Sequence, residues 1–118
     1  MLNKKNRISR AVFSSLVKSR SIRNPFFTMR ITFIKPNDED GRKFSVVVSK
    51  KTAPKAEERN KIRRRLYSAI QELLPRIKNG LAVVFFTQQK VREADFQTLK
   101  SEVEDAMVQA QILKKIEM

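Results

Sequence analysis

The 118-residue chain contains no cysteine and no histidine. Without thiol or imidazole groups, it has no disulfide, zinc finger, thiolate nucleophile or imidazole general base. Chemistry carried out by this chain alone would need carboxylates, hydroxyls or a metal ion held by oxygen atoms.

The chain also lacks a long apolar run. No stretch approaches the roughly 18 residues of a membrane-spanning helix, and no apolar segment of a secretion signal follows the basic "MLNKKNR" start. We therefore expect a cytoplasmic protein with no membrane partner, although a cationic helix lying on a membrane surface would also suit this charge if it had a broad apolar face. The length predicts a single domain over residues 1–118.

Acidic residues are scarce, with 12 Asp and Glu against 26 Lys and Arg, and the formal net charge is +14. Residues 1–65 hold 19 basic and 5 acidic side chains, whereas residues 66–118 hold 7 of each. A strongly basic chain of this kind binds polyanions. The excess in the first part of the chain indicates where a nucleic acid would bind.

Hydrophobic periodicity predicts an α+β fold of the order αββαβα, a small two-layer sandwich with helices packed on a mostly antiparallel sheet. The acidic turn at 36–41 joins the first two strands into a predicted antiparallel hairpin, and its acids are expected to be a solvated loop rather than a metal site. Six phenylalanines are assigned to core or sheet packing: Phe26, Phe27, Phe33, Phe44, Phe85 and Phe86. The predicted elements span 9–19, 27–35, 42–50, 58–74, 81–86 and 93–113.

The helix at 58–74 is amphipathic at about 100° per residue. A solvated charged face is the usual meaning of such a pattern, but the local excess of cations favours RNA binding. One side carries the apolar residues Ile62, Leu66, Ala69, Ile70 and Leu73, and the other carries Asn60, Lys61, Arg64, Arg65 and Ser68.

Three motifs in this region, "FSVVVSKK", "KAEERN" and "RNKIRR", resemble those of the bacterial ribonuclease P protein component, which read close to F-G-x-S-V-S-K-K and R-N-R-x-K-R-x-x-R. The similarity covers nearly the whole chain, from "NRI" near the start to "ADFQTLKSEVE" in the last helix. The chain differs from the family motifs at Val17, Ser45, Val47, Pro54, Arg65 and Tyr67.

The resemblance implies a subunit of a ribonucleoprotein, with an unusual left-handed crossover in its fold. In that family the catalytic RNA subunit, with bound Mg²⁺, removes the 5′ leader of precursor tRNA, and the protein binds both the RNA subunit and the leader. The implied partners are therefore the catalytic RNA and precursor tRNA, with Mg²⁺ bound mainly by RNA and no obligate protein partner. The tRNA-processing endonuclease activity would belong to the complex.

Carried over by position, the family motif implies RNA contacts along the second helix, leader contacts at the first helix and sheet, and no catalytic residue in the protein. A core position for Phe13 and a backbone bond for Ser49 are the structural alternatives. The RNA-binding residues are Lys50, Lys51, Arg59, Asn60, Lys61, Arg63, Arg64 and Arg65, and the leader-binding residues are Arg7, Arg10, Phe13, Arg30 and Ser49.

Two other functions remain open from the sequence. A general RNA-binding or ribosome-associated basic protein, without any nuclease, would have the same charge. A protein-only metallonuclease would have to use Asp38, Asp40 or Glu57, which do not form a recognisable constellation. The sequence assigns no residue to a protein-associated Mg²⁺ site.

Overall fold

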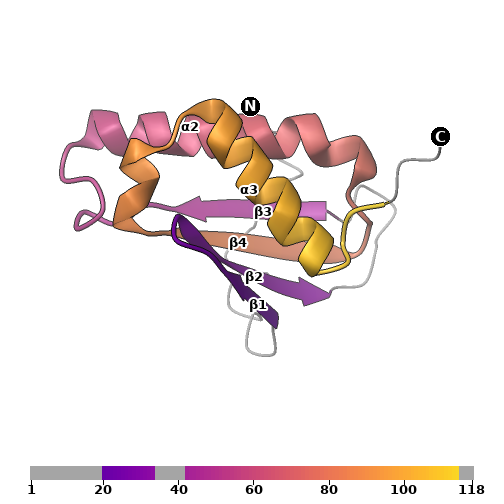
Figure 1. Ribbon diagram of the computed structural model, residues 1–118. Coiled ribbons are helices and arrows are strands. Elements are labelled where there is room, and N and C mark those ends of the chain that lie inside the picture. The colour runs from indigo at the N-terminus through magenta and orange to yellow at the C-terminus, as the bar shows by residue number, and fades with distance from the viewer. Residues whose placement is uncertain (1–19, 34–41, 115–118) are drawn as a thin grey trace.

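The computed structural model describes residues 20–33 and 42–114, which form a four-stranded sheet with two helices on one face (Figure 1). The helix predicted at 9–19 and the acidic turn predicted at 36–41 lie outside these residues. The elements in chain order are β1 (Arg20–Arg23), β2 (Phe27–Phe33), β3 (Arg42–Val47), α2 (Ala56–Leu73), the 3-10 turn η2 (Leu74–Arg76), β4 (Leu81–Thr87), the 3-10 turn η3 (Gln89–Glu93) and α3 (Phe96–Gln109).

The strand order is β1-β2-β4-β3. β2 runs antiparallel to β1 and β4, and β3 runs parallel to β4. The predicted α+β fold is therefore confirmed, but the predicted hairpin between 27–35 and 42–50 is wrong, because β4 lies between these two strands. The physical reason is the apolar character of β4, whose residues Leu81, Ala82, Val83, Val84 and Phe85 are all fully buried. A strand buried on both faces is suited to an interior position in the sheet.

β1 is a strand that the sequence did not predict, because only Ile22 of its four residues is apolar. It is held by a tight turn into β2. The side-chain Oδ1 of Asn24 accepts the backbone N–H groups of Phe26 and Phe27 at 2.8 and 2.9 Å, and the backbone N–H of Asn24 donates to the carbonyl of Phe27 at 3.0 Å. Asparagine bonds of this kind stabilise turns, and they close the β1–β2 hairpin here.

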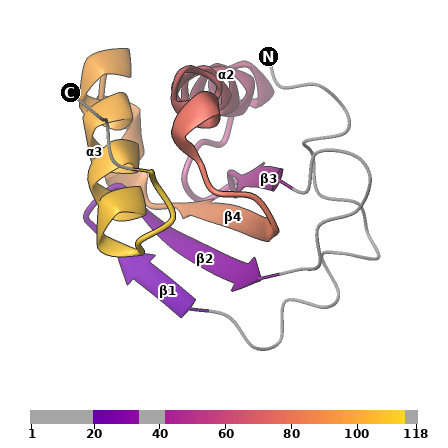
Figure 2. The same ribbon diagram turned by 90° about the vertical axis from the view of Figure 1, so that its right-hand side faces the viewer.

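α2 connects the parallel strands β3 and β4, which are neighbours in the sheet. Seen along β3 from its start, as in Figure 2, the chain turns counterclockwise from β3 over α2 and back into β4. The crossover is therefore left-handed, an exception to the strong preference for right-handed connections. This is the handedness that the family resemblance implied.

The apolar face predicted for α2 is confirmed, since Ile62, Leu66, Ala69, Ile70 and Leu73 are its buried residues. The helix ends where Leu74 and Pro75 begin η2, because proline lacks the backbone N–H that a continuing helix requires. Within the described residues, neither helix is both long enough and apolar enough to span a bilayer.

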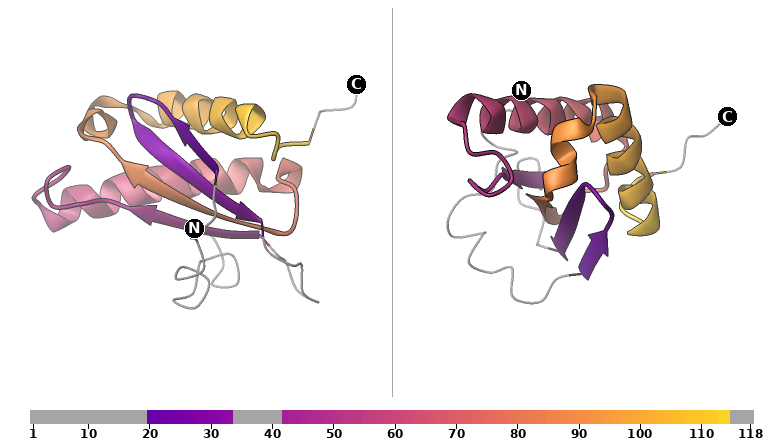
Figure 3. Two further views of the ribbon diagram at one scale, coloured as in Figure 1. Left: turned by 90° about the horizontal axis from the view of Figure 1, so that it is seen from below. Right: turned by 60° about the vertical axis from the view of Figure 1, so that its left-hand side comes forward.

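α3 begins at Phe96 rather than at 93, because residues 89–93 form the separate turn η3. Asp95 caps the helix by accepting the backbone N–H of Thr98 at 2.8 Å. α2 and α3 lie side by side on the same face of the sheet, and the layer between helices and strands is the hydrophobic core (Figure 3).

Three of the six phenylalanines assigned to packing, Phe27, Phe44 and Phe85, are fully buried in that core. The rings of Phe27 and Phe85 meet edge to face with their centres 5.1 Å apart. Phe33 contradicts the prediction, because 60% of its surface is exposed. It is the last residue of β2, and the guanidinium of Arg20 lies 5.3 Å from its ring centre, so Phe33 packs with a cation instead of the core.

Candidate RNA interface

The loop between β3 and α2 is a rigid turn that leaves two lysines exposed. The hydroxyl of Ser49 accepts the backbone N–H of Thr52 at 3.2 Å and lies 3.1 Å from the hydroxyl of Thr52, which is almost fully buried. The backbone carbonyl of Ser49 also accepts N–H groups of Thr52 and Ala53. Ser49 therefore shapes the turn, and Lys50 and Lys51 project from it into solvent.

Arg59 ties the start of α2 to this loop. Its Nη1 donates to the carbonyl oxygens of Ala53 and Pro54, each at 2.8 Å. No side chain caps the helix at Lys55. Arg59 thus fixes the direction in which the helix leaves the loop, whether or not it also contacts RNA.

The side of α2 that faces away from the core carries Asn60, Lys61, Arg63 and Arg64, which we call the cationic ridge. Asn60, Lys61 and Arg64 are exposed, as predicted, and Arg63 is half-exposed and donates to Oδ1 of Asn60 at 2.6 Å. Among the described residues, the ion pairs join Arg76 to Glu104, Arg92 to Glu58 and Lys100 to Glu72. None of these pairs neutralises a cation of the ridge, so its three positive charges remain available to phosphates.

Arg65 differs from its ridge neighbours because it is half-buried and turned toward the start of α3. Its Nη1 donates to the carbonyl oxygen of Ala94 at 3.2 Å. The backbone and side-chain hydrogen bonds from Thr98 lower the pKa of Asp95, and the charge of Arg65 contributes to the same direction. The arginine that replaces an apolar residue of the family motif therefore links α2 to α3.

The leader-binding residues are only partly placed. Arg7, Arg10 and Phe13 lie outside the described residues. Arg30 is exposed in the middle of β2, on the sheet face opposite the helices, because its neighbours Met29 and Ile31 both point into the core.

Around Arg30, this face of the sheet is lined by small, apolar and hydroxyl side chains. Val84 lies opposite Arg30 in β4, and Ser45 lies opposite Val84 in β3. Phe86, half-buried at the end of β4, belongs to the same face, since it alternates with buried Phe85 along the strand.

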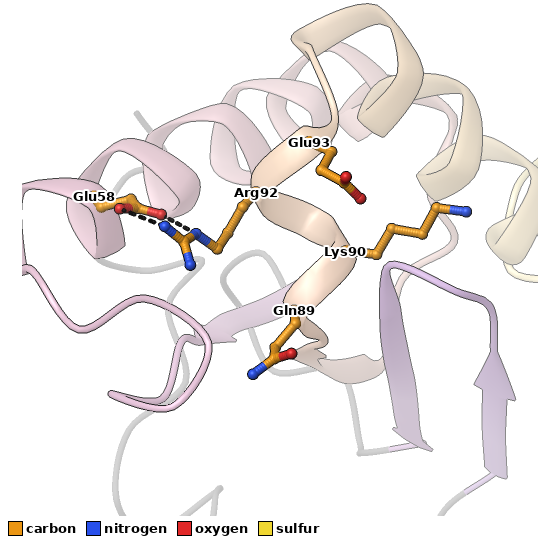
Figure 4. A pocket seen from close by; sticks show the side chains of 5 residues that line it. All are labelled: Glu58, Gln89, Lys90, Arg92 and Glu93. Atoms are coloured by element: carbon orange, nitrogen blue, oxygen red, sulfur yellow. Dashed lines mark hydrogen bonds and ion pairs between the residues drawn. The ribbon is translucent and has the colours of Figure 1, made fainter.

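An open hollow lies between the first turns of α2 and η3, and it has two adjoining parts that share Glu58 and Arg92. The larger part, of about 760 Å³, is shown in Figure 4. Arg92 reaches from η3 to Glu58, and its Nε and Nη2 both bind that carboxylate. The larger part is lined by Glu58, Gln89, Lys90, Arg92 and Glu93. The smaller part is lined by Lys55, Glu57, Glu58, Lys61, Ile62, Arg65 and Arg92.

The basic residues of η3 were missed from the sequence, because charge is balanced over residues 66–118 as a whole. The fold brings this segment next to the loop after β3, where the side-chain Nε2 of Gln89 donates to the carbonyl of Lys51 at 3.4 Å. Lys90 lies over the ring of Phe26, with 5.5 Å between Nζ and the ring centre. The motif "QQKVRE" directly after a strand was the only local signal for this cluster.

The described residues offer no group of three or more Asp, Glu, His or Cys side chains that could hold a metal ion. Glu57, one candidate for metal-dependent catalysis, is exposed in the first turn of α2, and Asp38 and Asp40 lie outside the described residues.

Comparison with known proteins gives the family. The sequence model of the Ribonuclease P family matches residues 2–111. A ribonuclease P protein component from Caldanaerobacter subterraneus is 32% identical over 101 residues, which cover 86% of this chain and 81% of that protein. Another from Pseudanabaena is 26% identical over 115 residues, covering 96% and 97% of the two chains.

The fold agrees with this assignment. The RNase P protein of Staphylococcus aureus superimposes with a TM-score of 0.77 at 21% identity, over 92% of this chain and 98% of that one. The basic helix, the left-handed crossover and the sequence match over almost the full length lead to the same conclusion. The chain belongs to the ribonuclease P protein family.

Proposed function

We propose that this chain is the protein subunit of the ribonuclease P ribonucleoprotein, and that it binds both the catalytic RNA and the 5′ leader of precursor tRNA. Membership of the family implies a role in the maturation of tRNA 5′ ends. The observation that carries the proposal further is the cationic ridge, because its charges project from a rigid helix and are not neutralised by any ion pair among the described residues.

The ridge suits the backbone of a folded RNA. Arg63 and Arg64 present guanidinium forks that bind phosphate oxygens in a bidentate manner, and Lys61 supplies a compact charge beside them. Lys50 and Lys51 extend the same surface from the loop before α2. These contacts fix the position of RNA without reading its sequence, which is the role expected of a protein that holds a catalytic RNA.

The opposite sheet face suits a single strand. Arg30 is a lone cation there, and aromatic rings stack on unpaired bases without selecting their identity. A surface of this kind accepts leaders of many sequences. The leader contacts proposed for Arg7, Arg10 and Phe13 would join it.

Catalysis in this proposal belongs to the RNA. Mg²⁺ ions bound mainly by RNA phosphates supply the metal-assisted hydrolysis. The residues of this chain bind and orient the RNA partners. Their positive charges offset part of the repulsion between RNA phosphates, so the complex requires a lower Mg²⁺ concentration.

Cleavage of a 5′-labelled precursor tRNA by a bacterial ribonuclease P RNA, measured over a range of Mg²⁺ concentrations, tests this function. We expect the protein alone to cleave nothing and the protein with the RNA to shift activity to lower Mg²⁺. Cleavage by the protein alone, or an unchanged Mg²⁺ requirement, would contradict the proposal.

Precursor tRNAs with and without a leader separate this function from that of a general RNA-binding protein. A ribonuclease P subunit binds the complex more tightly when the leader is present. Equal affinity for both substrates, together with copurification of ribosomal RNA instead of ribonuclease P RNA, would favour the general binding protein.

A further inference from the structure

We propose that the hollow between α2 and η3 binds a phosphate group of the RNA partner, with Arg92 as its principal ligand and Glu58 as the carboxylate that the phosphate displaces. The inference rests on the proposed function, since it extends the RNA interface from the cationic ridge around the first turns of α2. It adds a segment, η3, to which the family motifs of the sequence assigned no role.

The geometry of Arg92 is that of a cation held ready for an anion. Nε and Nη2 bind the two oxygens of Glu58, and within the described part of the chain Nη1 makes no hydrogen bond. The Arg92 side chain is 48% exposed. A phosphate offers the same pair of oxygen acceptors to a guanidinium as a carboxylate does.

Exchange of the two anions costs little. An ion pair between solvent-exposed side chains contributes only weakly to stability. A phosphate bound to Arg92 would also lie near the other cations of the smaller part of the hollow, whereas Glu58 stays on its own helix and reaches only Arg92. That part contains four basic and two acidic side chains, so the surroundings favour an anion.

The hollow is continuous with the cationic ridge. Lys61 belongs to both, because it is exposed on α2 and also lines the smaller part of the hollow beside Lys55 and Arg65. The bond from Arg65 to the carbonyl of Ala94 holds the residue just after η3 against α2, which keeps this wall of the hollow in place. An RNA backbone lying on the ridge therefore reaches Arg92 without leaving the protein surface.

A purely structural ion pair makes the opposite prediction for one substitution. If Arg92 and Glu58 only fasten η3 to α2, removing the carboxylate loosens the surface and weakens RNA binding. If Glu58 competes with phosphate, the same change releases Arg92 and strengthens binding. The sign of the effect of Glu58→Gln thus separates the two roles.

The test measures the affinity of the full chain for a bacterial ribonuclease P RNA transcript at several salt concentrations. We expect Glu58→Gln to tighten binding by about two- to fivefold, and Arg92→Gln to weaken it by a similar factor and to lower the magnitude of the salt slope by about one. Arg92→Lys, which keeps the charge but loses the fork, should retain the slope while binding less tightly.

Matched controls are available at the other end of α2. Glu72→Gln in α2 and Lys100→Gln in α3 remove an ion pair between these helices with the same changes of charge. Melting curves of all variants show whether they are folded at the temperature of the binding assay. Weaker binding by Glu58→Gln, or effects at Glu58 and Arg92 equal to those of the controls, would overturn the inference.

The outcome is independent of the larger proposal. If wild-type protein binds ribonuclease P RNA and Arg64→Ala weakens binding, the proposed function stands even when Arg92→Gln changes nothing. If wild-type protein does not bind that RNA, the proposed function and the inference fail together.

Discussion

At the scale of single residues, Tyr67 shows how this chain accommodates a departure from the family motif. Its hydroxyl accepts the backbone N–H of Val46 in β3 at 3.2 Å. β3 lies at the edge of the four described strands, so an N–H on its outer side has no partner among them. The tyrosine that stands in place of a motif arginine thus satisfies a backbone donor at the edge of the sheet.

Tyr67→Phe removes this acceptor while keeping the ring. We expect a loss of about 0.5–1.5 kcal/mol in the free energy of unfolding, because the N–H of Val46 loses its hydrogen bond. Urea denaturation measures the change. An unfolding midpoint equal to that of the wild type would show that water replaces the hydroxyl without cost.

Asp95 gives the fold a pH dependence whose sign is fixed by its cap. Hydrogen bonds from Thr98 lower the pKa of this carboxyl below 3.8 in the folded chain. The charged carboxylate therefore stabilises the fold at pH values above the ordinary pKa of 3.8. This contribution disappears as the pH falls through the lower pKa of the folded state.

Asp95→Asn keeps an oxygen for the cap but removes the charge. We expect this variant to melt at a lower temperature than the wild type at neutral pH, with the difference shrinking as the pH falls below 3.8. Thermal melts over this range test the prediction. Parallel curves for the two proteins would mean that the charge plays no part in the cap.

At the scale of elements, the buried side of α2 contributes to stability and its exposed side is proposed to bind RNA. Leu66→Ala should cost about 2–5 kcal/mol of unfolding free energy, because Leu66 is fully buried in the core. Arg64→Ala should leave stability nearly unchanged and weaken RNA binding, since Arg64 is exposed. Denaturation and RNA titration of both variants provide the measurement, and unfolding caused by Arg64→Ala would show that the ridge was assigned to the wrong face.

Periodicity predicted the buried face of α2 correctly because the spacing of Ile62, Leu66 and Ile70 is a local property of the helix, whereas Arg65 and Ser68, expected on the outer side, are half-buried. Strand neighbours are not local. β3 follows β2 in the sequence and was therefore predicted to pair with it. In the structure β4 pairs with β2 instead, because its long apolar run fits the interior of the sheet. Periodicity could not show β1 either, since its four residues are too few for alternation to appear.

The candidate site was predicted where it follows the helix and missed where it depends on tertiary contacts. Lys61 and Arg64 are exposed as the helical spacing required. The direction of Arg65 depends on the carbonyl of Ala94, 29 residues away. The approach of Arg92 to Glu58 likewise depends on how η3 packs against α2, and no pattern in the sequence contains that information.

At the scale of the whole molecule, charge is separated between elements. The basic residues of the loop after β3 and of α2 lie on one part of the surface, whereas α3 carries Glu102, Glu104 and Asp105 with a single lysine. A molecule with this asymmetry approaches a polyanion in a preferred orientation. Under the proposed function, this orientation would place the cationic ridge, rather than α3, against RNA.

This separation predicts a steep salt dependence. If the ridge and its flanks neutralise about six phosphates, affinity for RNA should fall on the order of a thousandfold between low and moderately high salt. Filter binding at increasing KCl measures the slope, and Arg64→Ala should reduce it by about one. A flat response would contradict an electrostatic interface.

The central place of β4 has a consequence for the order in which this protein is made. Among the strands of the described residues, β3 pairs only with β4, which occupies residues 81–87 and is synthesised after α2. The sheet therefore cannot be completed until those residues have left the ribosome, and a shorter nascent chain carries the basic helix without the scaffold that orients it. A nascent chain that ends before β4 therefore exposes the basic residues of α2 without the complete sheet beneath them.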